Sequence, residues 1–252
     1  MAGQGNNGPV PARVARLVNA VGPVPGKVAR FVNVVGLELL AGLVVLTGSA
    51  WIFGWMVEDL AEGDTKVDDR LAAWLHTQAS PGWTTFFENI TRLGNVSTLL
   101  VVVLLAAAVL WRKGWITELQ LLVLAGVGAE MITVGLKLGF QRDRPFFSDP
   151  LASETTYSFP SGHASVSLAV YGTLGFIAAR HLGSRRSRIV ALACAAALIL
   201  LIGFSRLYLG VHFLTDVIAG FSIGIAWVAL CVVLLQLRLR LQRRESSFQH
   251  ES

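Results

Sequence analysis

Charged residues are scarce in this sequence. Asp, Glu, Lys and Arg make up 15% of the 252 residues, whereas apolar residues make up 54%. Soluble domains carry about 25% charged residues, and the mean hydropathy here is positive, at +0.60. The composition therefore excludes an ordinary soluble domain and indicates a membrane protein.

Cysteine is nearly absent as well. Cys194 and Cys231 both lie within apolar segments, where they have neither the spacing of a metal site nor the exposure of a redox pair. We interpret both as thiols packed in a core. No cluster of His, Cys or carboxylate residues has metal-ligand spacing, so we expect no metal and no other cofactor.

Six apolar segments are long enough to cross a hydrocarbon core, which takes about 20 helical residues. The fourth and fifth are shorter and contain Ser, Thr or Gly, so a buried core helix is the alternative for each. We predict an all-α fold, a six-span transmembrane helical bundle with segments at residues 36–57, 94–111, 117–137, 163–180, 188–204 and 213–237.

The segments outside this bundle are basic. Residues 1–35 form an N-terminal tail with a local duplication, because residues 14–22 and 28–36 agree at seven of nine positions. Each copy suits either a short amphipathic helix on anionic lipid or a weakly ordered tail. The tail has no apolar core or cleavage site of a secretory signal, so the first span is expected to direct insertion. Residues 36–237 are predicted to form the functional domain, and residues 238–252 a second basic tail.

Lys and Arg are divided unevenly between the two sides of a six-span topology. Fourteen of the 21 fall in the two tails and in the second-to-third and fourth-to-fifth connections, and seven fall on the other side. The positive-inside rule then places both termini in the cytoplasm. The net charge of +5 reflects this orientation, so we expect membrane lipids as partners and no nucleic acid.

The first outside connection, residues 58–95, repeats apolar residues at helical spacing. We predict two short interfacial helices there. They suit either a cap over a site that admits lipid head groups or a set of aromatic anchors at the membrane interface.

Three polar clusters lie at the outer ends of apolar spans. They would meet if the spans form a bundle. The clusters are Lys137 with Arg144-Pro145, Pro160-Ser161-Gly162-His163, and Ser205-Arg206 with His212 and Asp216.

The residue types in these clusters suit phosphate chemistry. Lys137, Arg144 and Arg206 supply three cations for a dianionic tetrahedral ligand. Ser161 and Gly162 precede a predicted helix, whose free N–H groups favour an anion. The expected ligand is therefore a phosphate.

Two histidines in the clusters have different surroundings. His212 and Asp216 are four residues apart and share a helix face, so Asp216 can orient one ring nitrogen while the other attacks phosphorus. His163, on another helix, can protonate the departing alkoxide and later activate water. The pattern indicates a histidine nucleophile and a separate general acid.

The three clusters resemble the three-part signature of the type 2 phosphatidic acid phosphatase superfamily, with no gap at any signature position. The six spans and the placement of the clusters between them also resemble that family's layout. The resemblance implies that His212 forms a phosphohistidine, that Asp216 orients it and that His163 is the general acid. It also implies a phosphate site made by Lys137, Arg144, Ser161, Gly162 and Arg206.

These observations favour a metal-independent integral membrane lipid phosphatase. Its candidate substrates are lipid phosphates or diphosphates of the undecaprenyl diphosphate, phosphatidylglycerophosphate or phosphatidic acid type, and its active site is expected on the extracytoplasmic side. A lipid phosphotransferase with the same site is the alternative. A vanadium haloperoxidase is less favoured because those relatives are soluble, and a non-catalytic membrane protein because the catalytic set is intact.

Glu130 lies inside the third span, seven residues before Lys137. A charge at that depth costs about 2.5 to 3.5 kcal/mol on insertion scales. We expect Glu130 to face the bundle and find a partner there, and we favour a structural role over a catalytic one.

Overall fold

A computed structural model describes the backbone of residues 26–63 and 65–250, and the side chains of residues 40–63 and 65–239. This part of the chain contains helices and no strand, which confirms the predicted all-α fold. The elements are α2 (Gly26–Glu62), α3 (Lys66–Thr77), α4 (Pro81–Arg92), α5 (Val96–Arg112), α6 (Ile116–Phe140), α7 (Gly162–Ser167), the π-helical turn η1 (Leu168–Gly172), α8 (Thr173–His181), α9 (Arg185–Tyr208) and α10 (Leu214–His250).

The chain divides into two units at residue 42, within α2, and the candidate site described below lies in residues 42–252. The first copy of the duplicated segment, residues 14–22, lies outside the described residues. The second copy, residues 28–36, belongs to the N-terminal turns of α2, and its side chains are not described.

Among the described residues, five helical segments are long and apolar enough to cross a membrane, and the bent pair α4 and α5 raises the number to six when it is counted as one span. The number agrees with the six predicted spans, although the second predicted span, residues 94–111, covers only α5 of the bent pair. The fourth span is made of α7, η1 and α8 and is the most buried of the five. The five segments are Leu40–Glu62, Ile116–Phe140, Gly162–His181, Arg185–Tyr208 and Leu214–Leu239.

The cysteines differ from expectation. Cys231 is buried, but Cys194 on α9 is exposed, so the prediction of a packed thiol is wrong for Cys194. Its neighbours Val190 and Leu192 are exposed as well. In a membrane protein the lipid-facing surface is as apolar as the core, so an apolar sequence context does not distinguish the two environments.

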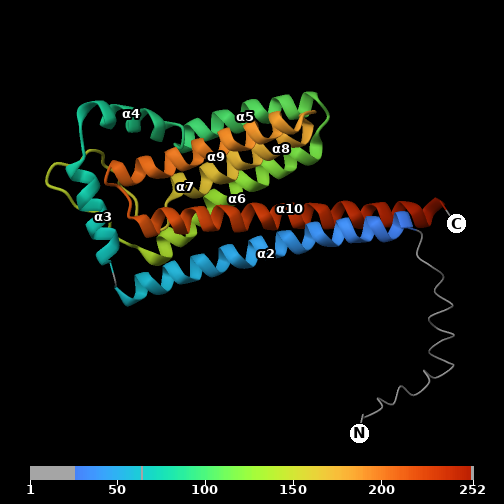
Figure 1. The fold of residues 1–252 in the computed structure, drawn as a ribbon, viewed down its shortest axis with the longest axis horizontal. Coiled ribbons are helices and arrows are strands. Elements are labelled where there is room, and N and C mark those ends of the chain that lie inside the picture. The colour runs from blue at the N-terminus through green and yellow to red at the C-terminus, as the bar shows by residue number, and fades with distance from the viewer. Residues whose placement is uncertain (1–25, 64, 251–252) are drawn as a thin grey trace, which may run out of the picture. The chain divides into compact units, whose positions relative to one another are not determined.

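The two short helices predicted in the first outside connection are α3 and α4. Pro81 occupies the first turn of α4, where its missing N–H costs nothing. Both helices contact α9, and α3 also contacts α10. They lie at the end of the bundle where α7 begins (Figure 1).

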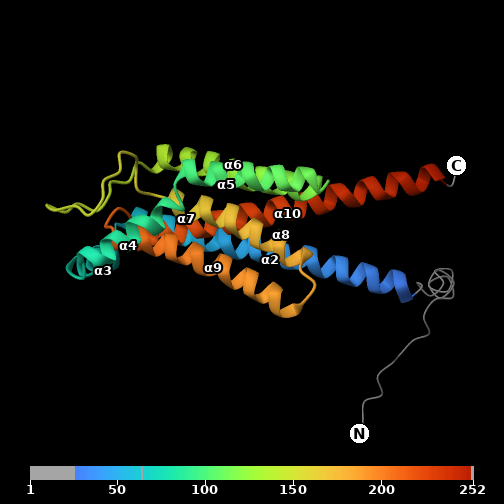
Figure 2. The same cartoon turned by 90° about the horizontal axis from the view of Figure 1, so that it is seen from above.

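α7 occupies the middle of the bundle, in contact with α6, α9 and α10 (Figure 2). Two glycines of α10 allow it to approach closely. A Cβ at Gly220 would lie 2.5 Å from the carbonyl oxygen of Ser161, and one at Gly224 would lie 2.8 Å from that of Ser165. Small residues four apart are typical of tightly packed membrane helices. This packing presses the start of α7 against the start of α10, which carries Asp216.

α6 ends in a sharp turn at Gln141. This residue has a left-handed backbone conformation with φ 50°, and its N–H donates to the carbonyl oxygen of Lys137 at 3.0 Å. A non-glycine residue in this region costs about 1 to 2 kcal/mol. The turn directs the following residues, Arg142 and Arg144, back toward the first turn of α10 and the loop before it.

Candidate active site

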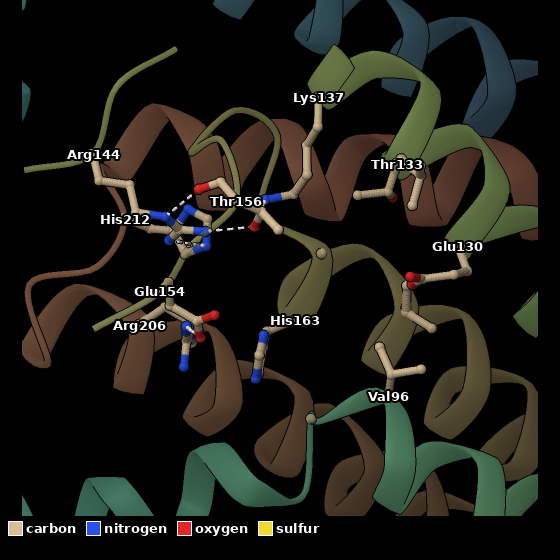
Figure 3. A pocket seen from close by; sticks show the side chains of 14 residues that line it. Val96, Glu130, Thr133, Lys137, Arg144, Glu154, Thr156, His163, Arg206 and His212 are labelled. Atoms are coloured by element: carbon tan, nitrogen blue, oxygen red, sulfur yellow. Dashed lines mark hydrogen bonds and ion pairs between the residues drawn. The ribbon is translucent and has the colours of Figure 1, made fainter. Parts of the chain in front are cut away.

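A cavity of about 230 Å³ lies where α6, α7 and α9 meet the bend between α4 and α5. Six of the eight predicted site residues line it. Figure 3 shows Arg144 and His212 on one side of the cavity and Glu130 and Val96 on the other, with His163 between them. The six are Lys137, Arg144, Gly162, His163, Arg206 and His212.

Lys137 and Arg144 are held by one stretch of the loop that follows α6. Lys137 Nζ donates to the carbonyl oxygen of Tyr157. Arg144 Nε donates to the carbonyl oxygen of Thr156 at 2.7 Å, and its Nη1 donates to that of Val211 at 2.6 Å. Burial lowers the pKa of Arg144, and the nearby carboxylate of Glu154 opposes this change. The two cations are therefore positioned mainly by neutral backbone carbonyls, and the carboxylate of Glu154 offsets part of the charge of Arg144.

Arg206 is 2% exposed and has partners from two other segments. Its Nη1 donates to Thr91 Oγ1 at 2.7 Å, and its Nη2 donates to a carboxylate oxygen of Glu154. Its Nε is buried and has no partner within the described side chains. Burial raises the pKa of Glu154, but Arg206, Arg144 and His212 together outweigh burial, so the pKa of Glu154 is lowered overall. Glu154 is thus a carboxylate inside the cation cluster, and the sequence patterns had not indicated it.

Asp216 is fully buried and orients His212. Asp216 Oδ2 lies 3.3 Å from His212 Nδ1 and also accepts from the N–H of Phe213 at 2.8 Å and from the hydroxyl of Ser158. An acceptor in this position favours the tautomer with the proton on Nδ1. His212 Nε2 is then the unprotonated nitrogen, and it lies 3.2 Å from Arg144 Nη1 at the edge of the cavity.

Electrostatics also favour a neutral His212. Burial lowers the pKa of His212 to about 4, although Asp216 opposes this shift. At neutral pH the Nε2 lone pair is therefore available, which a nucleophilic imidazole requires.

His163 is held by the bend between α4 and α5. Its Nε2 lies 2.9 Å from Asn95 Oδ1. Gly94 makes room for the ring, since a Cβ at that position would lie 2.8 Å from His163 Cδ2. Next to the same bend, Thr91 Oγ1 accepts a hydrogen bond from Arg206. The carbonyl oxygen of Leu93 accepts one from the hydroxyl of Tyr171 at 2.8 Å. These contacts tie the bend to two predicted site residues.

Ser161 lies behind the cavity. Its N–H donates to the carbonyl oxygen of Asp216 at 2.9 Å, and its hydroxyl accepts from the N–H of Ala164 as the cap of α7. Ser161 is fully buried and is not among the residues that line the cavity, so its contact with phosphate stays a prediction. Ser161 joins α7 to α10 and fixes the start of the helix that presents Gly162 and His163.

A second network behind the site centres on Arg142, which the sequence patterns did not single out. Its Nη1 donates to Asp216 Oδ1 at 2.6 Å, and its Nη2 donates to Asp68 Oδ2 at 2.9 Å. The three side chains are 8%, 0% and 3% exposed, respectively. Asp68 also accepts from the N–H of Thr215 at 3.1 Å. This network ties α3 to the residue that orients His212.

Glu130 faces the cavity and has no hydrogen-bonded partner among the described side chains. It is half-buried in the cavity wall, and the charge of Lys137, two turns further along α6, acts on it. Within residues 40–63 and 65–239, no three His, Cys, Asp or Glu side chains are arranged to hold a metal ion.

Comparison with known proteins places the chain in a family. Residues 118–240 match the PAP2 superfamily. Phosphatidylglycerophosphatase B of Bacillus subtilis (strain 168) is 39% identical over 141 residues, which make up 54% of this chain and 68% of that protein. The chain belongs to the PAP2 superfamily. The resemblance seen in the three sequence clusters is thereby confirmed.

Two solved structures share the fold of this PAP2 protein. One is the crystal structure of the first transmembrane PAP2 type phosphatidylglycerolphosphate phosphatase from Bacillus subtilis, with a TM-score of 0.69 and 28% identity over 75% of this chain and 94% of that one. The other is Aquifex aeolicus LpxE, with a TM-score of 0.53 and 25% identity over 65% and 93% of the two chains. Together with the apolar helices, these relatives identify a multi-pass membrane protein.

Proposed function

We propose that this protein is a metal-independent membrane lipid phosphatase that works through a phosphohistidine on His212. The observation that carries the proposal is the position of His212, whose Nε2 lies at the edge of a cavity lined by Lys137, Arg144 and Arg206. A nucleophile beside three cations suits attack on a phosphate dianion. The names of the PAP2 relatives support the same chemistry.

The reaction has two steps. His212 Nε2 attacks phosphorus, the bond from phosphorus to the lipid oxygen breaks, and His163 gives its proton to the departing alkoxide. A water molecule then gives a proton to His163 and attacks the phosphohistidine, which releases inorganic phosphate and restores His212. Asp216 stabilises the positive imidazole formed in the first step. The three cations neutralise charge on the phosphoryl oxygens without a metal ion.

Phosphatidylglycerophosphate is the first substrate to test, because two of the PAP2 relatives are named for it. Phosphatidic acid and undecaprenyl diphosphate are the other candidates. We further propose that residues 36–237 are the catalytic domain, between basic cytoplasmic tails at residues 1–35 and 238–252. The excess of Lys and Arg on the opposite side supports an extracytoplasmic active site.

The proposal is tested by measuring phosphate release from these three lipids by purified protein in detergent. The wild type should release phosphate from at least one lipid, with or without EDTA, whereas His212→Ala should be inactive on all of them. His181→Ala is the matched control, because His181 lies at the far end of α8, where it pairs with Glu118 at 3.4 Å, and it should keep wild-type activity. Activity that is lost in EDTA and restored by one divalent ion would contradict the metal-free mechanism.

A further inference from the structure

Glu130 is an acidic side chain in the cavity wall that the proposed reaction does not use and that, unlike Glu154, has no hydrogen-bonded cation beside it among the described side chains. Glu130 lies on α6 two turns before Lys137, whose charge acts on it, and no described side chain makes a hydrogen bond to it. An ionisable group within a membrane span is energetically costly, so its presence there indicates a function. The amine of Lys137 is directed instead to the carbonyl of Tyr157 and, at 3.4 Å, to Thr156 Oγ1.

The place of Glu130 relative to the nucleophile limits what it can contact. In Figure 3, His212 lies on one side of the cavity and Glu130 on the other, with His163 between them. In phosphoryl transfer the attacking and leaving atoms lie roughly in line on opposite sides of phosphorus. A lipid whose phosphate is attacked by His212 therefore directs its leaving oxygen past His163 and its next atoms toward Glu130.

The surroundings of Glu130 are otherwise apolar or already bonded. Val96, Val134 and Val166 are apolar residues of the cavity lining, and Figure 3 shows Val96 on the same side as Glu130. The hydroxyl of Thr133 is paired with Ser165 Oγ at 2.7 Å. Glu130 is thus the polar group there that remains available to a ligand.

The carboxylate of Glu130 limits which group of a ligand can bind to it. An ionised carboxylate only accepts hydrogen bonds, so a hydroxyl suits it well. A second phosphate attached to the leaving oxygen would bring acceptors and negative charge to the same place, which is unfavourable.

We infer that Glu130 is a specificity residue that accepts a hydrogen bond from a free hydroxyl of the leaving alcohol. The inference rests on the proposed phosphatase function. The preferred substrates are then lipid monophosphates whose leaving alcohol carries a free hydroxyl near the ester oxygen. Lipids that lack this hydroxyl, and lipid diphosphates, are poorer substrates.

A matched pair of substrates tests this inference. Lysophosphatidic acid carries a free hydroxyl next to the phosphorylated carbon, and its deoxy analogue with the same acyl chain lacks only that group. A hydrogen bond to a charged group changes kcat/KM by about 10-fold to 100-fold, so the wild type should prefer lysophosphatidic acid by that factor. A prenyl diphosphate serves as the third substrate.

Two variants separate hydrogen bonding from charge. In Glu130→Leu, the ratio of kcat/KM on lysophosphatidic acid to kcat/KM on the deoxy analogue should fall close to one. The variant should lose activity on lysophosphatidic acid and keep it on the deoxy analogue. Glu130→Gln should keep part of the preference, because an amide oxygen still accepts, and should gain activity on the prenyl diphosphate. Glu118→Leu, on the same helix but outside the cavity, should leave the preference unchanged.

The outcomes distinguish the inference from the function on which it rests. Equal loss on both matched substrates by Glu130→Leu, or a wild type without preference, would overturn the role of Glu130 and leave the phosphatase intact. If Glu130→Leu does not fold, an unchanged preference in Glu130→Gln together with an unchanged rate on the diphosphate would overturn it equally. A wild type that is inactive on every lipid phosphate would contradict the proposed function itself.

Discussion

Replacement of Arg142 by methionine is the most direct test of how the active site is supported. Arg142 joins two buried carboxylates, Asp216 at 2.6 Å and Asp68 at 2.9 Å, and its side chain is 8% exposed. Methionine preserves most of the apolar volume and removes the charge. Asp68 and Asp216 then remain buried with no cation between them. Breaking a buried ion pair from one side costs about 3 to 5 kcal/mol, so Arg142→Met should be strongly destabilised.

The kinetic effect of this substitution should appear in kcat. Arg142 does not line the cavity, so substrate affinity and KM should change little. Asp216 would lose one of its donors and hold His212 less firmly, and misplacement of a reacting group by about 1 Å costs roughly 100-fold. We expect kcat to fall by about that factor. Arg142→Lys should be intermediate, because lysine keeps the charge but loses the planar fork that reaches two carboxylates.

The assay combines phosphate release with thermal inactivation in the same detergent. Arg92→Met is the matched control, because Arg92 is exposed on α4 and its hydrogen bond goes to Asn89; exposed substitutions usually change stability by less than about 0.5 kcal/mol. Wild-type kcat in a folded Arg142→Met protein would refute the positioning role. A rise in KM without a fall in kcat would place Arg142 in substrate binding instead.

Three further predictions concern other contacts. Asn95→Ala should lower kcat more on an alkyl phosphate than on an aryl phosphate, because the loss of its bond to His163 matters most when the leaving group needs a proton; equal losses would contradict this. Gly220→Ala should lower the thermal midpoint, at a cost of about 1 to 3 kcal/mol for overpacking, whereas Gly135→Ala on an open face of α6 should not. The pKa of His212 is about 4, and protonation removes the lone pair that attacks phosphorus. As the pH is lowered, kcat/KM on an aryl phosphate, corrected for substrate ionisation, should therefore fall only near pH 4. A fall centred near pH 6.5 would exclude a neutral His212 with this lowered pKa as the nucleophile.

A labelling experiment tests the proposed orientation. Cysteines placed at Ser153, in the loop after α6, and at Gly183, between α8 and α9, should react with an impermeant thiol reagent from opposite sides of the membrane. The background must carry Cys194→Ser, because Cys194 is exposed. Labelling of residue 153 from the cytoplasm alone would invert the topology.

The spans were predictable because a helix that crosses a membrane needs a long apolar run, and such runs are visible in the sequence. The bend between α4 and α5 was not. In the sequence, Gly94 and Asn95 mark the boundary between the first outside connection and the second span. Only the structure shows that they connect two helices bent by 47°. Gly94 leaves room for the His163 ring, and these two residues are far apart in the chain. No local sequence pattern could have predicted their contact.

The pairing of His212 with Asp216 was predictable from their separation of four residues. The expected shared helix face was wrong, because His212 lies in the loop before α10 and only Asp216 is on the helix. The site was not predictable where side chains from separate segments meet. Arg142 lies two residues before Arg144 and looked like another loop cation, and Asp68 looked like one of several acids in the first outside connection. Their pairing follows from the turn at Gln141 and the docking of α3, which are tertiary features.

The two histidines look alike in the sequence but have different partners in the structure. In the sequence, each is a polar residue at the end of an apolar span. In the structure, His212 has a buried carboxylate on one ring nitrogen and leaves the other at the cavity, whereas His163 is bonded to the neutral amide of Asn95. A carboxylate stabilises the imidazolium that a nucleophilic attack creates, and an amide does not offer that charge. The difference between a nucleophile and a proton donor therefore lies in the residue behind each ring, which is why we assign the two roles from Asp216 and Asn95 rather than from the histidines themselves.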